Sequence, residues 1–283
     1  KRSVTALGMA IIWFGLSVQM TDFLTKSSML EYYTVGEYFI WSTVGQAILI
    51  MIGVLIWDIG LKYGISFATS ISSAFGTIGG KVIGVARILP GLFFFGVNGF
   101  MGGSALNEIS KLLFNFDCIW LYILINAALL VWVVAHGSKG IEIFSTIALP
   151  IMLVVALYLL YAVMDTYDAT LASVWNMGGT GEPRSFFYAI CVAIGGYTAV
   201  VIGMNDFGKD LKRTDEEVKK GWWGRNKKFA ILSVLFGAIS FGFITSLAVT
   251  CVGLTGEPNP LAMITQIVGA KSIVLAVAMQ LFI

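Results

Sequence analysis

The chain has 283 residues, of which 58% are hydrophobic and 12% are charged. Its mean hydropathy is +0.87, whereas roughly 25% of the residues in an ordinary soluble domain are charged. This composition excludes a water-soluble globular domain. The apolar runs are continuous rather than alternating, which disfavours a membrane β-barrel. We therefore expect an all-α integral membrane protein that crosses the bilayer several times.

The apolar runs predict the helices in chain order. Spans are expected over residues 5–24, 36–57, 82–113, 118–136, 141–163, 185–207 and 228–254, and an eighth span begins within 261–272, about seven and a half helices in all. The stretch 58–81 is too polar and too rich in glycine to span, so it is predicted to be a short interfacial or re-entrant piece. The chain has no initiator Met and stops inside an apolar run, so we expect residues 1–283 to form a single transmembrane domain, truncated at both ends.

The positive charges are distributed unevenly between the two sides of these spans. If the N-terminus is cytoplasmic, all but four of the 18 Lys and Arg residues lie on the inner side, and the exceptions are Lys26, Lys111, Arg184 and Lys271. The positive-inside rule then predicts a multi-pass protein of the cytoplasmic membrane with a cytoplasmic N-terminus. Acidic residues interrupt the basic run 209–228, which favours a solvated loop over a nucleic-acid or lipid-binding patch.

The first and sixth spans both lose their hydrophobic regularity near mid-membrane, at Gly15 to Gln19 and at Gly195-Gly196. In transporters built from inverted repeats, equivalent helices of the two halves are interrupted at the midplane, where ions and substrate bind. An offset of five helices is what a five-plus-five repeat produces. The two interruptions therefore predict a transporter domain with discontinuous first and sixth helices.

Polar side chains in the first span are expensive at membrane depth and are functional candidates. Gln19 could hydrogen-bond a substrate. Asp22 lies closer to the outer end, where it is either a residue that couples transport to an ion or simply hydrated. The sequence leaves both interpretations open.

In the third span, Phe94 and Asn98 stand four residues apart and so share one helical face. A flat heterocycle needs such a pair, because the ring stacks on the aromatic side chain and the amide binds its edge. The alternative is that Asn98 bonds a neighbouring helix while Gly99 and Gly103 permit close packing. Both interpretations are open at this point.

In the sixth span, Gly195-Gly196 is followed by Tyr197. Each glycine costs a helix about 1 kcal/mol relative to alanine, so the backbone here is predicted to unwind and to expose its own polar groups to a ligand. The alternative is a packing notch between helices.

Enzyme chemistry has little support in the sequence. The single histidine, His136, falls at the end of a span, and the three cysteines are scattered singly, so neither a metal site nor a catalytic triad is indicated. The string Asn205 to Asp210 resembles the Asp-rich motif of membrane prenyltransferases, but three residues lie between its aspartates, whereas the motif has two between its first two aspartates. No enzyme is therefore predicted, and a prenyltransferase is kept only as the weakest alternative.

Several longer segments match one family in order along the whole chain. They are Tyr63-Gly64-Ile65-Ser66-Phe67 through Phe75-Gly76, Phe93 to Gly102, Ala105 to Ile109, Ile12-Trp13-Phe14 with Gln19, Met177-Gly178-Gly179, and Gly195 to Val201. With these segments the chain resembles the nucleobase:cation symporter family.

The resemblance implies a fold like that of the leucine transporter, with spans one to five and six to ten as inverted repeats. It also implies substrates such as hydantoins, allantoin, cytosine, uracil or purines. The aromatic residues that stack the substrate ring fall on Phe94 and Tyr197, the amide that grips its edge falls on Asn98, and Gly196 contributes backbone polarity. The carbonyl groups that ligate sodium fall on Gly15 and Val18.

Three departures from the family pattern bear on the substrate and the ion. Phe94 and Tyr197 stand where the family has tryptophans, and Asn98 stands where it has glutamine, so the pocket is reshaped. The eighth-span residues that complete the sodium site fall after Ile283.

The sequence as a whole predicts a secondary active symporter that imports a planar nucleobase-like or hydantoin-like compound with Na⁺, or with H⁺ as the alternative. The alternative function is transport of another small solute, such as an amino acid, on the same fold. No cofactor and no nucleic acid are expected, and the partners are the heterocyclic substrate and the lipid bilayer, with the protein as a monomer.

Overall fold

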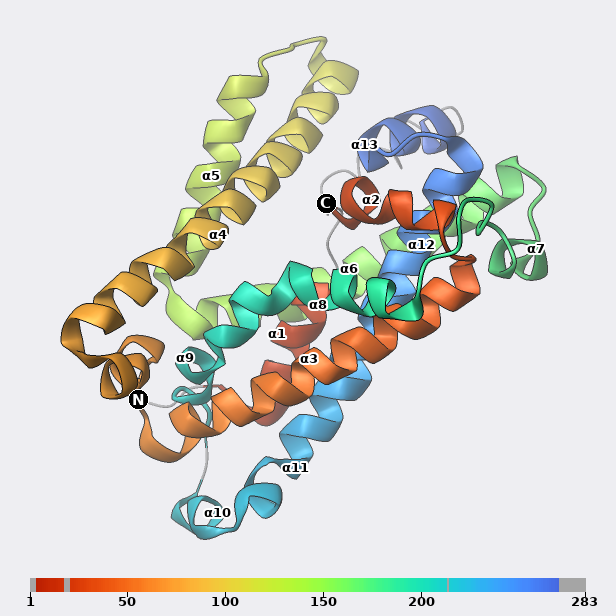
Figure 1. The fold of residues 1–283 in the computed structure, drawn as a ribbon. Helices are drawn as coiled ribbons and strands as arrows, with labels where there is room; N and C mark the ends of the chain where they lie inside the picture. The colour runs from red at the N-terminus through yellow and green to blue at the C-terminus, as the bar shows by residue number, and fades with distance from the viewer. Residues whose placement is uncertain (1–3, 18–20, 213, 270–283) are drawn as a thin grey trace.

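The computed structural model describes residues 4–17, 21–212 and 214–269. Its described residues are almost entirely helical (Figure 1). The elements are α1 (Ala6–Ser17), α2 (Thr21–Lys26), the 3₁₀ turn η1 (Ser27–Glu31), α3 (Val35–Tyr63), α4 (Phe67–Phe114), α5 (Ile119–Ala135), α6 (Gly137–Thr166), α7 (Leu171–Trp175), α8 (Phe186–Ile202), α9 (Met204–Gly208), α10 (Asp215–Lys219), α11 (Trp222–Ser233), the π-helical turn η2 (Val234–Ala238), α12 (Ile239–Thr255), α13 (Pro260–Met263) and the π-helical turn η3 (Ile264–Val268).

Among the described residues, four helical segments are long and apolar enough to cross a membrane. They are Val35–Tyr63, Phe67–Phe114, Thr146–Thr166 and Trp222–Thr255, and Ile119–Ala135 and Phe186–Gly195 are shorter apolar helices. Each of these corresponds to a span predicted from the apolar runs. The described residues of the first predicted span form α1 and α2, and Val18 and Gln19 lie outside the described residues.

The polar stretch 58–81 is divided between two helices. α3 runs on to Tyr63 and ends at Gly64, whose positive φ of 69° forms a left-handed cap. The next helix, α4, starts after the N-cap Ser66 and is kinked at Gly76, where φ is 70°. Residues 67–75 are therefore a short helical piece set off from the long span that follows, in agreement with the predicted short segment between spans two and three.

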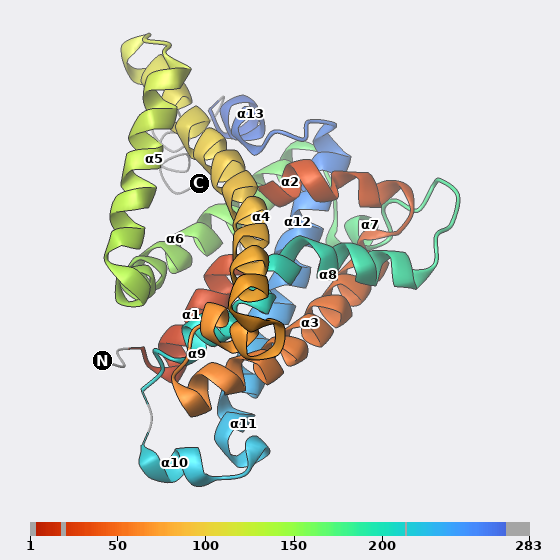
Figure 2. The ribbon, with the colours of Figure 1, turned by 60° about the vertical axis from the view of Figure 1, so that its left-hand side comes forward.

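α4 and α5 form a long antiparallel hairpin whose far end projects beyond the other helices (Figure 1), and α5 lies on the outside of α4 (Figure 2). Close packing between them depends on Gly103, because a Cβ there would collide with the backbone of Ile123. The side chain of Asn126 in α5 donates to the backbone carbonyl groups of Asn98 at 3.5 Å and Gly99 at 3.3 Å.

The sixth span differs from the prediction in the position of its interruption. α8 is helical without a break through Gly195-Gly196 and ends at Ile202, and Gly203 forms the turn to α9. The prediction that the helix unwinds at the glycine pair was therefore wrong in position. One physical reason is packing, because α8 lies along α3, where Gly45 brings the two backbones together at Ile190, and such tertiary contact outweighs glycine's low helix propensity.

The buried core is built around α3, α8 and α12. Tyr197 and Phe241 belong to one apolar cluster with Ala193 and Trp57, and Trp57 stacks on Phe229 of α11 with ring centroids 3.8 Å apart. Beside that stack, the Asp58 carboxylate accepts two hydrogen bonds of 2.6 Å from the Arg225 guanidinium. These contacts hold α3 and α11 together at the end of α3 that leads into α4.

Candidate substrate cavity

A cavity of about 650 Å³ lies between α4 and α8. Four of the residues predicted to bind substrate line it, two from each helix: Phe94, Asn98, Gly196 and Tyr197. Its volume falls within the roughly 300–1,000 Å³ of typical small-molecule sites. The fifth, Gln19, lies outside the described residues.

Polar side chains line this cavity. The Asn98 side chain is half-buried, and the phenol of Tyr197 is buried with its Oη unbonded among the described residues. The Tyr197 ring is fixed by an edge-on contact with Phe241 at 5.2 Å between centroids. Because buried polar atoms are nearly always hydrogen-bonded, these groups are suited to a polar ligand.

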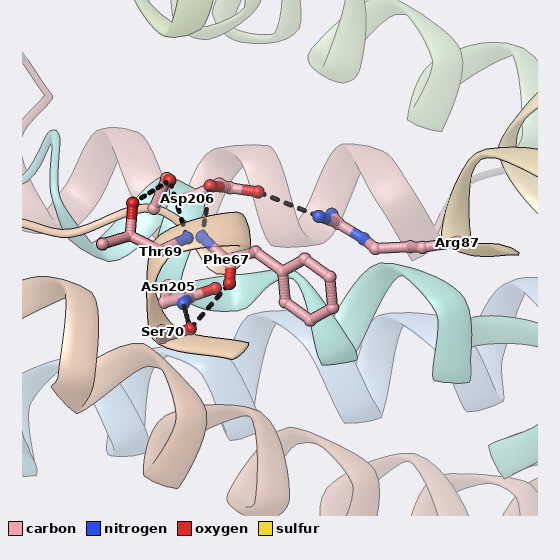
Figure 3. A network of polar contacts seen from close by, with 7 residues as sticks. Phe67, Thr69, Ser70, Arg87, Asn205 and Asp206 are labelled. Atoms are coloured by element: carbon pink, nitrogen blue, oxygen red, sulfur yellow. Dashed lines mark hydrogen bonds and ion pairs between the residues drawn. The ribbon is translucent and has the colours of Figure 1, made fainter. Parts of the chain in front are cut away.

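One end of the cavity is formed by Arg87 of α4 and Phe207 of α9. Arg87 Nη1 lies 2.9 Å from Asp206 Oδ2, and Asp206 Oδ1 accepts a 2.9 Å hydrogen bond from the backbone N–H of Phe67 (Figure 3). The Arg87 guanidinium also lies 4.7 Å from the centre of the Phe67 ring. The carboxylate thus joins the start of α4, a later turn of α4, and α9.

Asn205 adds a second bond to this network, because its Nδ2 donates to Ser70 Oγ at 2.7 Å (Figure 3). A neighbouring cavity of about 530 Å³ is lined by Ser66, Lys81 and Asp206 and shares Gly84, Arg87 and Ile88 with the larger one. Arg87 therefore stands in the wall between two cavities.

Sequence reasoning missed this network. It counted Arg87 among the inner cations and weighed Asp206 only as part of an Asp-rich motif. The available signal was that both residues fall inside predicted spans, where an ionisable side chain needs a partner.

Asp22 and Lys26 were expected near the outer surface, and the structure buries both. Asp22 is 3% exposed and Lys26 is 7% exposed. The Lys26 ammonium donates to the carbonyl of Val192 in α8 at 3.4 Å. The interpretation of Asp22 as a hydrated residue was therefore wrong, and the assignment of Lys26 to the outer side stays a prediction.

The predicted ion ligands are only partly described. Gly15 lies in α1, and Val18 lies outside the described residues. No group of three or more His, Cys, Asp or Glu side chains that could hold a metal occurs within residues 4–17, 21–212 and 214–269. Asp206 is the first aspartate of the Asp-rich motif. Its carboxylate already binds the Arg87 guanidinium and the backbone N–H of Phe67.

The fold is that of a helical membrane protein with a cavity between α4 and α8. Residues 1–281 match the family described as "Permease for cytosine/purines, uracil, thiamine, allantoin". The chain belongs to this family, the nucleobase:cation symporters predicted from the sequence motifs.

Two curated relatives and two solved structures resemble the chain. It is 29% identical to a hydantoin permease of Microbacterium maritypicum, over 100% of this chain and 58% of that protein. It is 22% identical to an allantoin permease of Bacillus subtilis (strain 168), over 82% of this chain and 51% of that protein. The chain therefore spans about half to three fifths of the length of these relatives.

Both solved structures are of Mhp1, a nucleobase-cation-symport-1 family transporter. The closed conformation with bound bromovinylhydantoin superposes with a TM-score of 0.92 at 28% identity, covering 99% of this chain and 62% of that one. The inward-facing conformation gives 0.88 at 28% identity, with 100% and 61% covered. These matches confirm the predicted leucine-transporter-like fold and the multi-pass membrane location.

Proposed function

We propose that the protein is a secondary active symporter that imports a planar hydantoin-, allantoin- or nucleobase-like compound by alternating access. The observation that carries the proposal is the cavity in which Phe94, Asn98, Gly196 and Tyr197 meet. The relatives named for hydantoin and allantoin, and the hydantoin bound to Mhp1, support the substrate class.

In the proposed complex, the flat ring of the substrate lies between Phe94 and Tyr197, and the Asn98 amide pairs with a ring N–H or C=O. An aromatic contact contributes about 0.5–1.5 kcal/mol beyond area burial. The amide of Asn98 can donate and accept at once, which suits the adjacent N–H and C=O groups of a cyclic imide or ureide.

We propose that Na⁺ drives uptake, with the backbone carbonyl groups of Gly15 and Val18 among its ligands, and that H⁺ is the alternative coupling ion. We also propose that the N-terminus is cytoplasmic, that no cofactor is needed and that the protein acts as a monomer. If Na⁺ binding favours the substrate-binding state, the linkage is reciprocal, so Na⁺ and substrate each raise the affinity for the other.

Uptake in cells that express the full-length protein tests this proposal. Radiolabelled benzylhydantoin, allantoin, cytosine, uracil and leucine are compared with and without a Na⁺ gradient. Accumulation of a ring compound above the vector control supports the proposal. Accumulation of leucine alone would favour the amino acid alternative, and no accumulation of any of them would contradict the substrate class.

Variants assign the site. Phe94→Ala, Asn98→Ala and Tyr197→Ala are each expected to abolish saturable uptake at normal membrane abundance. The matched control is Phe93→Ala, because Phe93 is the adjacent residue, is 67% exposed and is not among the residues that line the cavity. Equal loss in Phe93→Ala and Phe94→Ala would show that the cavity does not hold the substrate.

A further inference from the structure

Behind the cavity wall lies a buried polar cluster that the proposed binding of a neutral ring does not use. It consists of Asp22 and Lys26 of α2, Tyr38 of α3 and Tyr197 of α8, each less than a tenth exposed. Asp22 interacts electrostatically with Lys26 and with both phenols. Two opposite charges and two hydroxyl groups are thus gathered inside the protein.

The hydrogen bonds of this cluster are incomplete. Asp22 Oδ2, Tyr38 Oη and Tyr197 Oη have no partner among the described residues. Asp22 and Lys26 interact through space, but the structure shows no direct ion pair between them, and the printed partner of the ammonium is the Val192 carbonyl. A buried charge costs several kcal/mol unless it is paired and fully bonded, so such a cluster is expensive to retain as a purely structural feature.

The cluster adjoins the substrate cavity through two residues. Gly196 lines the cavity, and the Lys26 ammonium lies 3.5 Å from the position of a Cβ on Gly196. Tyr197 also lines the cavity, and its buried Oη, which has no hydrogen-bond partner among the described residues, interacts electrostatically with Asp22. A change of charge at Asp22 therefore acts directly on the wall of the cavity.

The neighbouring elements bring few other titratable groups near Asp22. α12 packs on α2 and places the Cys251 thiol in the same apolar cluster as Phe23. α4 also contacts α2, but Arg87 is paired with Asp206 and Glu108 is paired with Lys111. Tyr33, which precedes α3, uses its hydroxyl elsewhere, because this group donates to the Ser185 carbonyl at 2.7 Å.

We propose that Asp22 is a proton-binding residue of the transport cycle and that Lys26 is its fixed counter-charge. Asp22 Oδ2 takes one proton from the outer solution and becomes a neutral carboxylic acid whose O–H can donate to a neighbouring oxygen. The pair then carries one net positive charge, which is the charge of a coupled cation. When the site faces the cytoplasm, the same O–H bond breaks, the proton leaves to the cytoplasmic water, and the ionised pair is restored.

This inference rests on the proposed function, since it assigns a binding residue to H⁺, the alternative coupling ion of the proposed transport. Ionisable residues inside a membrane protein typically mark ion pathways and proton relays. The carboxylate is the proton acceptor, because its Oδ2 has no bonded donor, whereas Lys26 already donates to a carbonyl as an ammonium does.

The test uses the full-length protein in proteoliposomes that contain a pH-sensitive dye, at a fixed Na⁺ concentration on both sides. Addition of the substrate that the uptake screen identifies is expected to drive proton entry, and acidification of the outer side is expected to raise the uptake rate. Asp22→Asn is expected to lose both effects and to retain substrate exchange, because exchange needs no net proton movement. Glu182→Gln is the control, since Glu182 is exposed, and it is expected to behave as wild type.

Asp22→Glu keeps a carboxylate, so it is expected to show the proton entry that Asp22→Asn loses. Lys26→Met is expected to lose proton entry, and Lys26→Arg is expected to keep it. Substrate uptake by wild type without proton entry would overturn the inference and leave the proposed function intact, whatever the variants do. Proton entry that persists in Asp22→Asn would also overturn it. Absence of uptake of any compound would instead be a failure of the proposed function.

Discussion

Arg87 and Asp206 are 119 positions apart in the chain, and their side chains meet in a 2.9 Å ion pair at one end of the large cavity. The pair connects α4, which carries Phe94 and Asn98, to α9, which follows the helix that carries Tyr197. If these helices move relative to one another, the ion pair either breaks or stays intact and moves with them. We therefore expect it to control access to the cavity from that end.

Asp206→Asn should make the cavity more accessible. The amide oxygen can still accept from Phe67 N–H, but the ion pair is lost. An ion pair whose two side chains are each about a third exposed contributes about 1 kcal/mol. A cysteine introduced at Ala199, which lines the cavity, should react roughly fivefold faster with a thiol reagent. Labelling is measured in inverted vesicles with Cys191, the exposed native cysteine, replaced by serine. Equal rates with and without Asp206→Asn would show that the pair does not restrict access.

Gly203→Ala should impair transport without much loss of stability. A Cβ at Gly203 would overlap the Arg87 guanidinium, and that flexible group can move only by leaving Asp206. The matched control is Gly195→Ala in α8, the helix that ends just before Gly203, because nothing lies within 4 Å of the added Cβ there. Uptake should fall severalfold in Gly203→Ala and stay near wild type in Gly195→Ala, while both retain their melting temperatures in detergent. Impaired uptake in both variants would contradict this assignment of Gly203.

Arg225→Met should destabilise the fold strongly. Arg225 and Asp58 form a two-bond ion pair with side chains only 8% and 15% exposed, and removal of one partner of a buried pair leaves an unpaired charge at a cost of about 3–5 kcal/mol. The control is Lys111→Met, because Lys111 and Glu108 are 38% and 33% exposed and such pairs contribute about 0–1 kcal/mol. Thermal unfolding of the purified protein compares the two. A similar small shift in both would show that the Asp58 site is solvated.

Gly60→Ala tests the contact between α3 and α9. A Cβ at Gly60 would overlap the backbone carbonyl of Asn205, which no side-chain rotation can relieve. Overpacking of this kind typically costs about 1–3 kcal/mol. Gly96→Ala is the control, since its added Cβ meets nothing within 4 Å, and it should unfold at or slightly above the wild-type temperature. A neutral Gly60→Ala would mean that α9 lies further from α3 than the structure shows.

The spans and one face of the cavity could be predicted because they depend on neighbours along the chain. Apolar runs identify helices, and the spacing of Phe94 and Asn98 alone places both side chains on one face of α4. The pairing of that face with Gly196 and Tyr197 followed from family resemblance, and the structure brings all four to one cavity. Their role in substrate binding stays a prediction.

The position of the interruption in the sixth span could not be predicted in the same way. Two adjacent glycines lower helix propensity at residues 195 and 196, yet α8 continues through them and stops at Gly203. The deciding contacts come from Gly45 of α3 and from the Arg87 guanidinium against Gly203, and neither is near in sequence.

The sequence by itself determined that this is a multi-span helical membrane protein of the nucleobase:cation symporter type. Hydropathy, helical spacing and motif order could reveal this because they depend only on the order of residues along the chain. Only the tertiary structure decided where the charges are. It buried Lys26 against α8 and joined Arg87 to Asp206. In a low-dielectric interior a charge is stable only where a partner lies within a few ångströms, and that proximity is set by the packing of distant helices.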